Sequence, residues 1–267
     1  MERALQILLQ LRYQELLARR GPFPELRDVG FRSFSQNEED GVLLYLFSLI
    51  GAPTRRSVEI CAGDGIECNT ANLLLRHGWT GLLVDGDEAK VTRGREFYRR
   101  AKETRLWRPT FVHAWITAEN VDALLSQHGF SGDVDLLSID VDGMDYWIWK
   151  AIRAATPRVV VIESQDVWGP DIAVTVPYDR EFRSRVTMEG PEYGGASLAA
   201  LVKLGREKGY RLVGCERYGF NAFFVRSGIG EDVLPEIEPS RCFEHPRTRR
   251  DLEARLARVR RQRWIEV

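Results

Sequence analysis

The chain has few cysteines, and none of the four belongs to a closely spaced pair. Cys61, Cys68, Cys215 and Cys242 form no Cys-x-x-Cys motif. Long apolar runs are also missing, so no stretch has the length and hydropathy of a signal peptide or a membrane span. We therefore expect a reduced, cytoplasmic protein.

The chain also lacks an excess of either charge, with 38 basic residues against 39 acidic ones and a formal net charge of −1. Such a balance gives no general attraction to nucleic acid or to acidic membranes, and we expect neither as a partner. The length of 267 residues suits one α/β domain with additions. A domain of that size buries roughly 70–75% of its unfolded surface, which is enough for a core without disulfides.

Strands and helices are predicted to alternate between Ser57 and Arg226, which is typical of a mainly parallel sheet with helices on both faces. The apolar strand candidates are Ser57–Cys61, Gly81–Val84, Thr110–Val112, Leu136–Ile139 and Val159–Ile162. The helix candidates are Asn69–Arg76, Ala89–Lys102, Ala118–Gln127, Tyr146–Ala155 (ended by Pro157) and Ser197–Lys208.

The last two strand candidates, Tyr210–Cys215 and Phe220–Arg226, are joined too closely for a parallel crossover. The last strand should therefore be antiparallel. A dinucleotide-binding domain would instead continue with another helical crossover.

Three segments follow from this pattern. Residues 1–32 form an N-terminal helical extension, whose helix Ala4–Arg20 aligns Leu5, Leu8, Leu9, Tyr13, Leu16 and Leu17 on one face. Residues 33–227 form the ligand-binding domain and begin with a capped helix start at Ser33–Gly41. Residues 228–267 form a C-terminal helical tail. We expect the terminal helices to pack on the core or to join copies of the chain in a homo-oligomer, such as a homodimer.

An apolar strand, Val58–Cys61, ends in a tight glycine turn through Gly63 and Gly65, and Asp85 closes the next strand candidate. A turn of this kind brings backbone amides close to a ligand, and an acidic residue at the next strand end can bind a ribose. The sequence therefore predicts a cofactor that contains a nucleoside.

Two kinds of cofactor compete for this signal. A dinucleotide site needs a third small residue, but the spacing from Gly63 and Gly65 places Cys68 there, beside Glu67, which would repel a diphosphate. Glu59 and Asp64 are also negative, and they suit a ligand with a cationic amine and a sulfonium. S-adenosylmethionine is such a ligand.

Several strings resemble the FkbM-like family of class I S-adenosylmethionine-dependent methyltransferases. They are Ser35-Gln36 with Glu39-Asp40-Gly41, Glu59–Gly65, Leu137–Tyr146, Pro157–Glu163 and Asn221–Arg226, and the match spans roughly residues 33–226. The resemblance implies a Rossmann-like, seven-stranded sheet and methyl transfer, commonly to an oxygen of a natural product, sugar or lipid. Cys61 departs from the family, because the first glycine of the motif belongs there; a cysteine fits if its backbone torsion is ordinary.

The resemblance also implies residue roles. Glu59 and the backbone of Ala62, Gly63, Asp64 and Gly65 would surround the methionine half of the cofactor, and Gln36 would touch its carboxylate. Asp85, followed by Gly86, would bind both ribose hydroxyls. Trp115 would lie by the adenine or in the core, and Asp140 would lie beside the cofactor.

The candidates for catalysis lie at the ends of the third, fourth and fifth strand candidates, and those for acceptor binding lie in the long segment after the fifth. Asp142 is the first candidate for a general base and His113 the second. The alternative for Asp142 is an Asp-Gly turn or a helix cap, and a lone histidine such as His113 is more often structural. Carboxylates at Asp140, Asp142 and Glu163 could bind Mg²⁺. The long segment 164–196 would line the acceptor pocket with Trp168, Tyr178 and Tyr193.

We therefore expect an enzyme that methylates an oxygen of a small molecule. Peptide, protein or nitrogen acceptors remain alternatives, as does a module that binds cofactor or partner without turnover.

Overall fold

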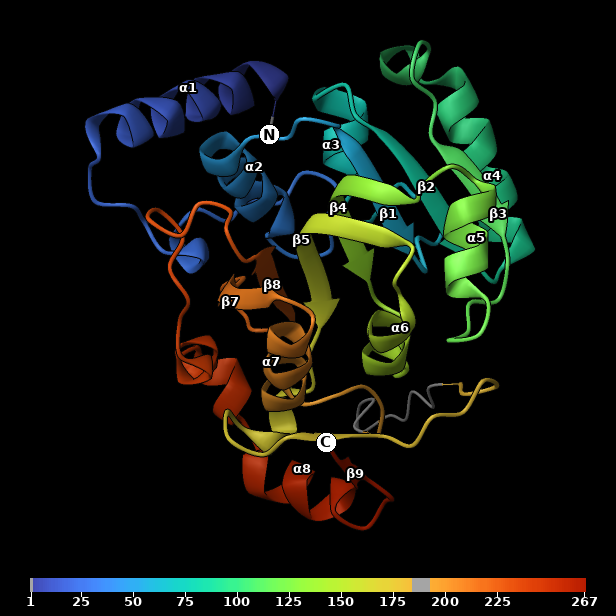
Figure 1. Cartoon of the computed structure of the whole chain (residues 1–267), viewed down its shortest axis with the longest axis vertical. Helices are drawn as coiled ribbons and strands as arrows, with labels where there is room; N and C mark the ends of the chain where they lie inside the picture. Colours follow the sequence, from blue (N-terminus) through green and yellow to red (C-terminus); the bar gives the residue numbers. More distant parts are fainter. Residues whose placement is uncertain (1, 184–192) are drawn as a thin grey trace.

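A seven-stranded sheet in the order β3-β2-β1-β4-β5-β8-β7 forms the centre of the computed structural model, which describes residues 2–183 and 193–267 (Figure 1). β8 runs antiparallel to both of its neighbours, and the other paired strands are parallel. The predicted mainly parallel sheet with an antiparallel last strand is therefore confirmed. The strands are β1 Arg56–Ile60, β2 Thr80–Asp85, β3 Thr110–His113, β4 Gly132–Ile139, β5 Ala155–Glu163, β7 Tyr210–Cys215 and β8 Asn221–Arg226.

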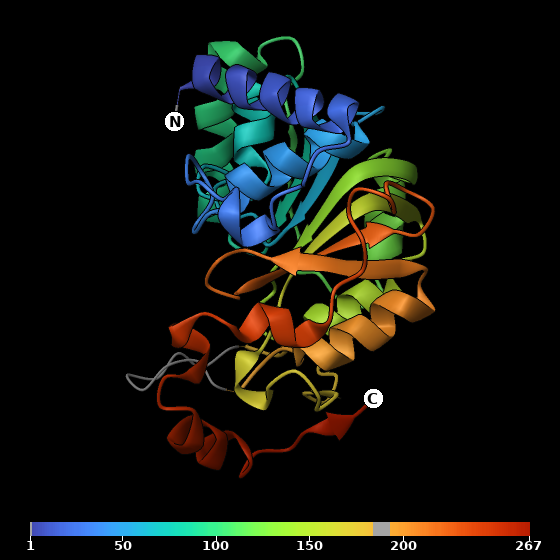
Figure 2. The same ribbon diagram turned by 90° about the vertical axis from the view of Figure 1, so that its left-hand side faces the viewer.

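The central strands are apolar on both faces because helices cover both sides of the sheet. Neighbouring residues point to opposite faces, so Leu137 and Val160 belong to one buried cluster while Leu136 and Val161 belong to the other. Figure 2 shows α1 and α2 on one side of the sheet and α7 on the other. The helices are α1 Arg3–Arg19, α2 Glu39–Ile50, α3 Ala71–Arg76, α4 Glu88–Arg100, α5 Val121–Gln127, α6 Asp145–Ala151, α7 Leu198–Glu207 and α8 Leu252–Val259.

The start of α2 is held by reciprocal polar contacts, in line with the predicted cap. Ser35 Oγ accepts a hydrogen bond from the backbone N–H of Asp40 at 3.2 Å. In return, one oxygen of the Asp40 carboxylate accepts the N–H groups of Ser33, Phe34 and Ser35. These bonds fix the segment before α2 against the first turn of the helix.

The predicted end of α6 was wrong. The helix stops at Ala151, and Pro157 lies inside β5, where it pairs with Val134 of β4. A proline near the start of a strand costs only one ladder hydrogen bond, so it does not have to mark the end of a helix.

The apolar face predicted for the first helix was wrong in part. Leu5 and Leu8 are 53% and 61% exposed, whereas Gln6 and Tyr13 are buried. Gln6 is accommodated because its amide exchanges two hydrogen bonds with Asn72 of α3, both at 3.0 Å. Self-association through the terminal helices stays a prediction.

The segment after β5 is only partly described, since residues 184–192 of the predicted acceptor segment 164–196 lie outside the described residues. Its described part contains a short strand, β6 Val174–Thr175, that pairs with β9 Ile265–Glu266. The sequence pattern did not predict this pairing. Within residues 2–183 and 193–267, no helix has the length and hydropathy needed to cross a membrane.

Candidate functional site

Polar side chains follow one register row across the C-terminal edge of the sheet. Asp85 pairs with His113, and Glu163 pairs with Asn221. Between these two pairs, Ile60 of β1 is paired with Val84 of β2 and with Ile139 of β4, and Ile139 is paired with Ile162 of β5. The residues that directly follow these four therefore lie side by side at the ends of their strands. Together with the two outer residues they form a strand-end row: His113, Asp85, Cys61, Asp140, Glu163 and Asn221. Strand ends in open α/β sheets are where ligands bind, so the row marks the candidate site.

A cavity of about 880 Å³ opens over the β3–β4 part of this row. Predicted site residues that line it are Gly63, Asp85, Gly86, His113, Trp115, Asp140, Asp142 and Tyr178. Residues that the sequence did not suggest also line it, among them Cys61, Lys90, Met144, Asp179, Arg180, Phe182 and Arg183. The volume lies within the range that accommodates a cofactor-sized ligand.

The glycine turn needs left-handed torsions at three positions. Gly63 and Gly65 have φ values of 59° and 67°, and Cys61 has a φ of 63°. A side chain on Gly65 would meet Leu83 Cδ2 at 2.5 Å, so glycine is required there for space as well. The condition of an ordinary torsion at Cys61 is thus not met, and the cysteine is held in a conformation that glycine adopts more easily.

Asp85 fixes this turn while facing the cavity. One carboxylate oxygen accepts the N–H of Gly63 at 2.7 Å, and the other accepts the N–H of Asp87 at 2.8 Å. Each carboxylate oxygen has a second lone pair. Asp85 can therefore accept further hydrogen bonds from hydroxyl groups of a ligand in the cavity.

Trp115 forms a wall of the cavity and is not part of the core, because it is 45% exposed. Its ring lies against Gly86, where an added Cβ would come within 2.8 Å of Cε3. Trp115 Nε1 donates to the carbonyl of Arg180 at 2.8 Å, and the Arg183 guanidinium lies 4.7 Å from the ring centroid. A flat base could stack against such an aromatic wall.

The β4 end of the cavity is strongly acidic. Burial and the nearby Asp142 raise the pKa of Asp140 to about 6, and burial and Asp140 raise the pKa of Asp145 to about 7. Asp145 also accepts the N–H groups of Val141 and Gly143, which shapes the turn that presents Asp142. Asp142 itself is exposed and has a φ of 52°. A cationic ligand would relieve this crowding of carboxylates.

The predicted magnesium site is not supported. Glu163 does not line the cavity with Asp140 and Asp142. Across the described ranges 2–183 and 193–267, no group of three or more His, Cys, Asp or Glu side chains is arranged to hold a metal ion.

Five residues predicted to bind the cofactor lie away from the cavity lining: Gln36, Glu59, Ala62, Asp64 and Gly65. Glu59 is buried, and its carboxylate accepts the N–H of Thr70 at 2.7 Å just before α3. Gln36 is exposed. The carbonyl of Gly65 accepts a hydrogen bond from Tyr98. These residues shape or flank the turn.

The aromatic residues predicted for the acceptor pocket divide into two groups. Tyr178 lines the cavity, and its hydroxyl donates to Glu119 at 2.6 Å. Trp168 and Tyr193 instead pack against Trp264 near the C-terminus, with ring centroids 5.1 and 5.5 Å away. The sequence could not indicate this packing, because Trp264 lies about 100 and 70 residues further along the chain.

No family model and no curated protein matches the chain. Solved structures of S-adenosylmethionine-dependent class I methyltransferases have a similar fold. The N-terminal domain of EvdMO1 with bound S-adenosylhomocysteine (SAH) is 15% identical, with 84% of this chain and 95% of that chain covered and a TM-score of 0.46. The glycopeptide N-methyltransferase MtfA with SAH is 10% identical, with 74% of this chain and 93% of that chain covered and a TM-score of 0.44.

A putative O-methyltransferase from Klebsiella pneumoniae is 17% identical, covers 82% of this chain and 90% of its own, and has a TM-score of 0.43. These likenesses concern the fold. The narrower FkbM-like assignment is not confirmed, since no family model matches.

Proposed function

We propose that this protein is an S-adenosylmethionine-dependent methyltransferase that methylates an oxygen of a small molecule, such as a natural product or a sugar. One observation carries the proposal. Gly63 of the glycine turn, Asp85 and Trp115 line one cavity at the C-terminal edge of the sheet. They offer a close approach to the backbone, a carboxylate acceptor for ribose hydroxyls and an aromatic wall for a base.

The charges of the cavity fit this cofactor. Asp85, Asp140 and Asp142 all line it, and their carboxylates favour a ligand with a positive sulfonium and amine over a dinucleotide diphosphate. When bound, S-adenosylmethionine supplies an electrophilic methyl group. The chain's own contribution is to hold the acceptor in line with that group, and orientation of this kind supplies about 7–11 kcal/mol.

Asp142 is our candidate for the general base. It is exposed, lines the cavity and follows β4, two residues beyond Asp140 of the strand-end row. His113 lies at the β3 end, where its Nε2 is 3.1 Å from the carbonyl of Gly86. If Nε2 carries a proton, it donates a hydrogen bond to this carbonyl, and His113 then holds Gly86 in the wall of the cavity. A positioned base adds roughly 10²–10⁴-fold to the rate.

Calorimetric titration with SAH tests the cofactor, and formation of SAH from S-adenosylmethionine with a panel of hydroxylated acceptors tests turnover. We expect SAH to bind and Asp85→Ala to raise its Kd at least tenfold, because a hydrogen bond to a charged group contributes about 1.5–3 kcal/mol. Asp171→Asn, at an exposed position outside the cavity, is the control. Absence of heat with SAH would refute the proposal, and binding without turnover would favour a non-catalytic module.

A further inference from the structure

The strand-end row continues past the cofactor cavity to Glu163 and Asn221. These two residues are direct partners in the antiparallel β5–β8 ladder, so their side chains lie on the same face of the sheet. Neither residue lines the cofactor cavity. They therefore lie on the β5 side of Asp140, next to the cavity in the strand-end row and outside its lining.

The Asn221 amide is buried and only half satisfied. The residue is 7% exposed, and its Nδ2 donates to Glu39 Oε1 at 2.8 Å. Its Oδ1 is buried with no hydrogen-bond partner. If the amide were reversed, its oxygen would face the Glu39 carboxylate, and neither group would have a hydrogen to donate. The observed orientation is therefore the favourable one. A buried oxygen of this kind calls for a donor.

Carboxylates surround this amide. Glu39 contacts it directly, and Glu163 lies opposite it with part of its surface exposed. Burial, together with Asp140, Asp145 and Asp142, raises the pKa of Glu163 well above its ordinary value. A ligand group that enters here meets the carboxyl groups of Asp140 and Glu163 and the amide oxygen of Asn221, and a positively charged group would favour the ionised form of Glu163.

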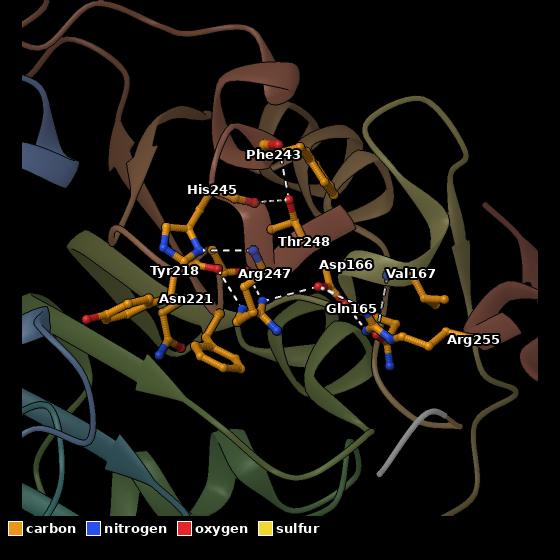
Figure 3. Close-up of polar contacts among 12 residues, drawn as sticks. Gln165, Asp166, Val167, Tyr218, Asn221, Phe243, His245, Arg247, Thr248 and Arg255 are labelled. Atoms are coloured by element: carbon orange, nitrogen blue, oxygen red, sulfur yellow. Dashed lines mark hydrogen bonds and ion pairs between the residues drawn. The ribbon is translucent and has the colours of Figure 1, made fainter. Parts of the chain in front are cut away.

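The charge of the nearby Arg247 offsets part of this crowding of carboxyl groups, but the Arg247 guanidinium makes its direct contacts with other residues. Arg247 donates from Nε to the carbonyl of Tyr218 at 2.8 Å, lies 3.2 Å from an Asp166 oxygen and stacks 3.7 Å from the Phe220 ring centroid. Figure 3 shows this network, with the Asn221 amide pointing away from the Arg247 guanidinium. In the part of the chain that the structure describes, no basic side chain forms an ion pair with Glu163 or Asp140.

We propose that the methyl acceptor carries a basic amine and that its ammonium group donates hydrogen bonds to the Glu163 carboxylate and to Asn221 Oδ1. This inference rests on the proposed function. An ammonium group combines positive charge with three donors, whereas a neutral hydroxyl offers one donor and an anion offers none. A protonated nitrogen has no lone pair to attack a methyl group, so a different atom of the same molecule, such as a hydroxyl oxygen, receives the methyl.

Matched probes separate the amine from the rest of the acceptor: tyramine against 4-ethylphenol, dopamine against 4-methylcatechol, and glucosamine against glucose. Their binding is measured by ligand-observed NMR titration in the presence of saturating SAH. We expect at least one amine to bind tenfold or more tightly than its neutral partner. Glu163→Gln should abolish that preference and leave the Kd of SAH unchanged.

Two control variants test whether the loss of the amine preference is due to the charge of Glu163. Glu163→Asp keeps the charge and should retain a preference for the amine. Glu103→Gln makes the same chemical change at an exposed position and should behave as the wild type. If SAH binds but no amine is preferred, or if Glu163→Gln keeps the preference, the inference is wrong and the proposed function stands. If SAH does not bind, both are wrong.

Discussion

Asp85 Oδ2 accepts the backbone N–H of Gly63 at 2.7 Å, which ties the end of β2 to the glycine turn after β1. One carboxylate thus holds the turn and faces the ligand cavity. Asp85→Ala leaves the N–H groups of Gly63 and Asp87 without their acceptor, and a lost acceptor of this kind costs about 1–3 kcal/mol. We expect urea denaturation to show a lower free energy of unfolding, alongside the weaker SAH binding. A variant that loses binding at full stability would separate the two roles.

Cys61 occupies a left-handed torsion that suits glycine, so Cys61→Gly should stabilise the fold. Relief of about 1–2 kcal/mol of torsional strain is partly offset by the greater freedom of glycine in the unfolded chain, which leaves a gain of roughly 0.5–1 kcal/mol. Thermal denaturation measures the change. Cys68→Gly is the matched control, because Cys68 has no positive φ, and it should destabilise. A loss of stability in Cys61→Gly would show that the thiol contributes more than the torsion costs.

Gly86 gives Trp115 its place in the cavity wall. In Gly86→Ala the new methyl group would lie 2.8 Å from Trp115 Cε3, so the ring has to move. We expect the Kd of SAH to rise several-fold while the melting temperature changes little, since the indole is partly exposed. Gly21→Ala is the control, because its added Cβ would find its nearest atom at 3.5 Å. Unchanged SAH affinity in Gly86→Ala would mean that the ring does not contact the cofactor.

Glu59 should make the protein less stable as the pH rises toward neutrality. Burial raises its pKa to about 7, above the ordinary value in the unfolded chain, so the folded state retains a proton that the unfolded state releases. The free energy of unfolding should therefore fall between about pH 4.5 and pH 7. Glu59→Gln removes this contribution. In Glu59→Gln, the free energy of unfolding measured with urea should differ between pH 5 and pH 8 by about 2 kcal/mol less than it does in the wild type. Equal differences in the two proteins would contradict the assignment.

The fold could be predicted from the sequence because its signals are local. Apolar runs such as Leu136–Ile139 and the close spacing of Tyr210–Cys215 and Phe220–Arg226 specify strands and an antiparallel end without knowledge of distant contacts. The end of α6 was missed because the pattern read Pro157 as a helix stop, whereas the pairing with Val134 places it in a strand.

The predicted residues that line the cavity come mostly from strand ends and the turns that follow them, with Tyr178 of the long segment as an addition. Asp85, His113 and Asp140 lie in the register row that any parallel sheet creates, so their approximate positions follow from the strand pattern. Arg180 and Arg183 come from an irregular segment with no periodicity, and only the folded chain brings them to Trp115. The contact between Trp168 and Trp264 could not be predicted for the same reason, since the two residues are remote in sequence.

Asp166 joins the segment after β5 to the C-terminal part of the chain. It is 5% exposed and forms ion pairs with Arg247 and Arg255. Asp166→Ala removes a buried carboxylate that forms ion pairs with two partly buried guanidinium groups, and we expect a loss of about 3 kcal/mol in the free energy of unfolding. Limited proteolysis should then cut the region around α8 faster than in the wild type. Asp171→Asn serves as the control, and an unchanged cleavage rate would argue that the aromatic contacts of Trp264 suffice.

The same ion pairs have a consequence during synthesis. Arg255 follows Asp166 by 89 residues, so the segment after β5 leaves the ribosome long before its partner does. The nascent chain can therefore assemble most of its parallel sheet early, whereas the ion pair between Asp166 and Arg255 forms only after α8 has been synthesised.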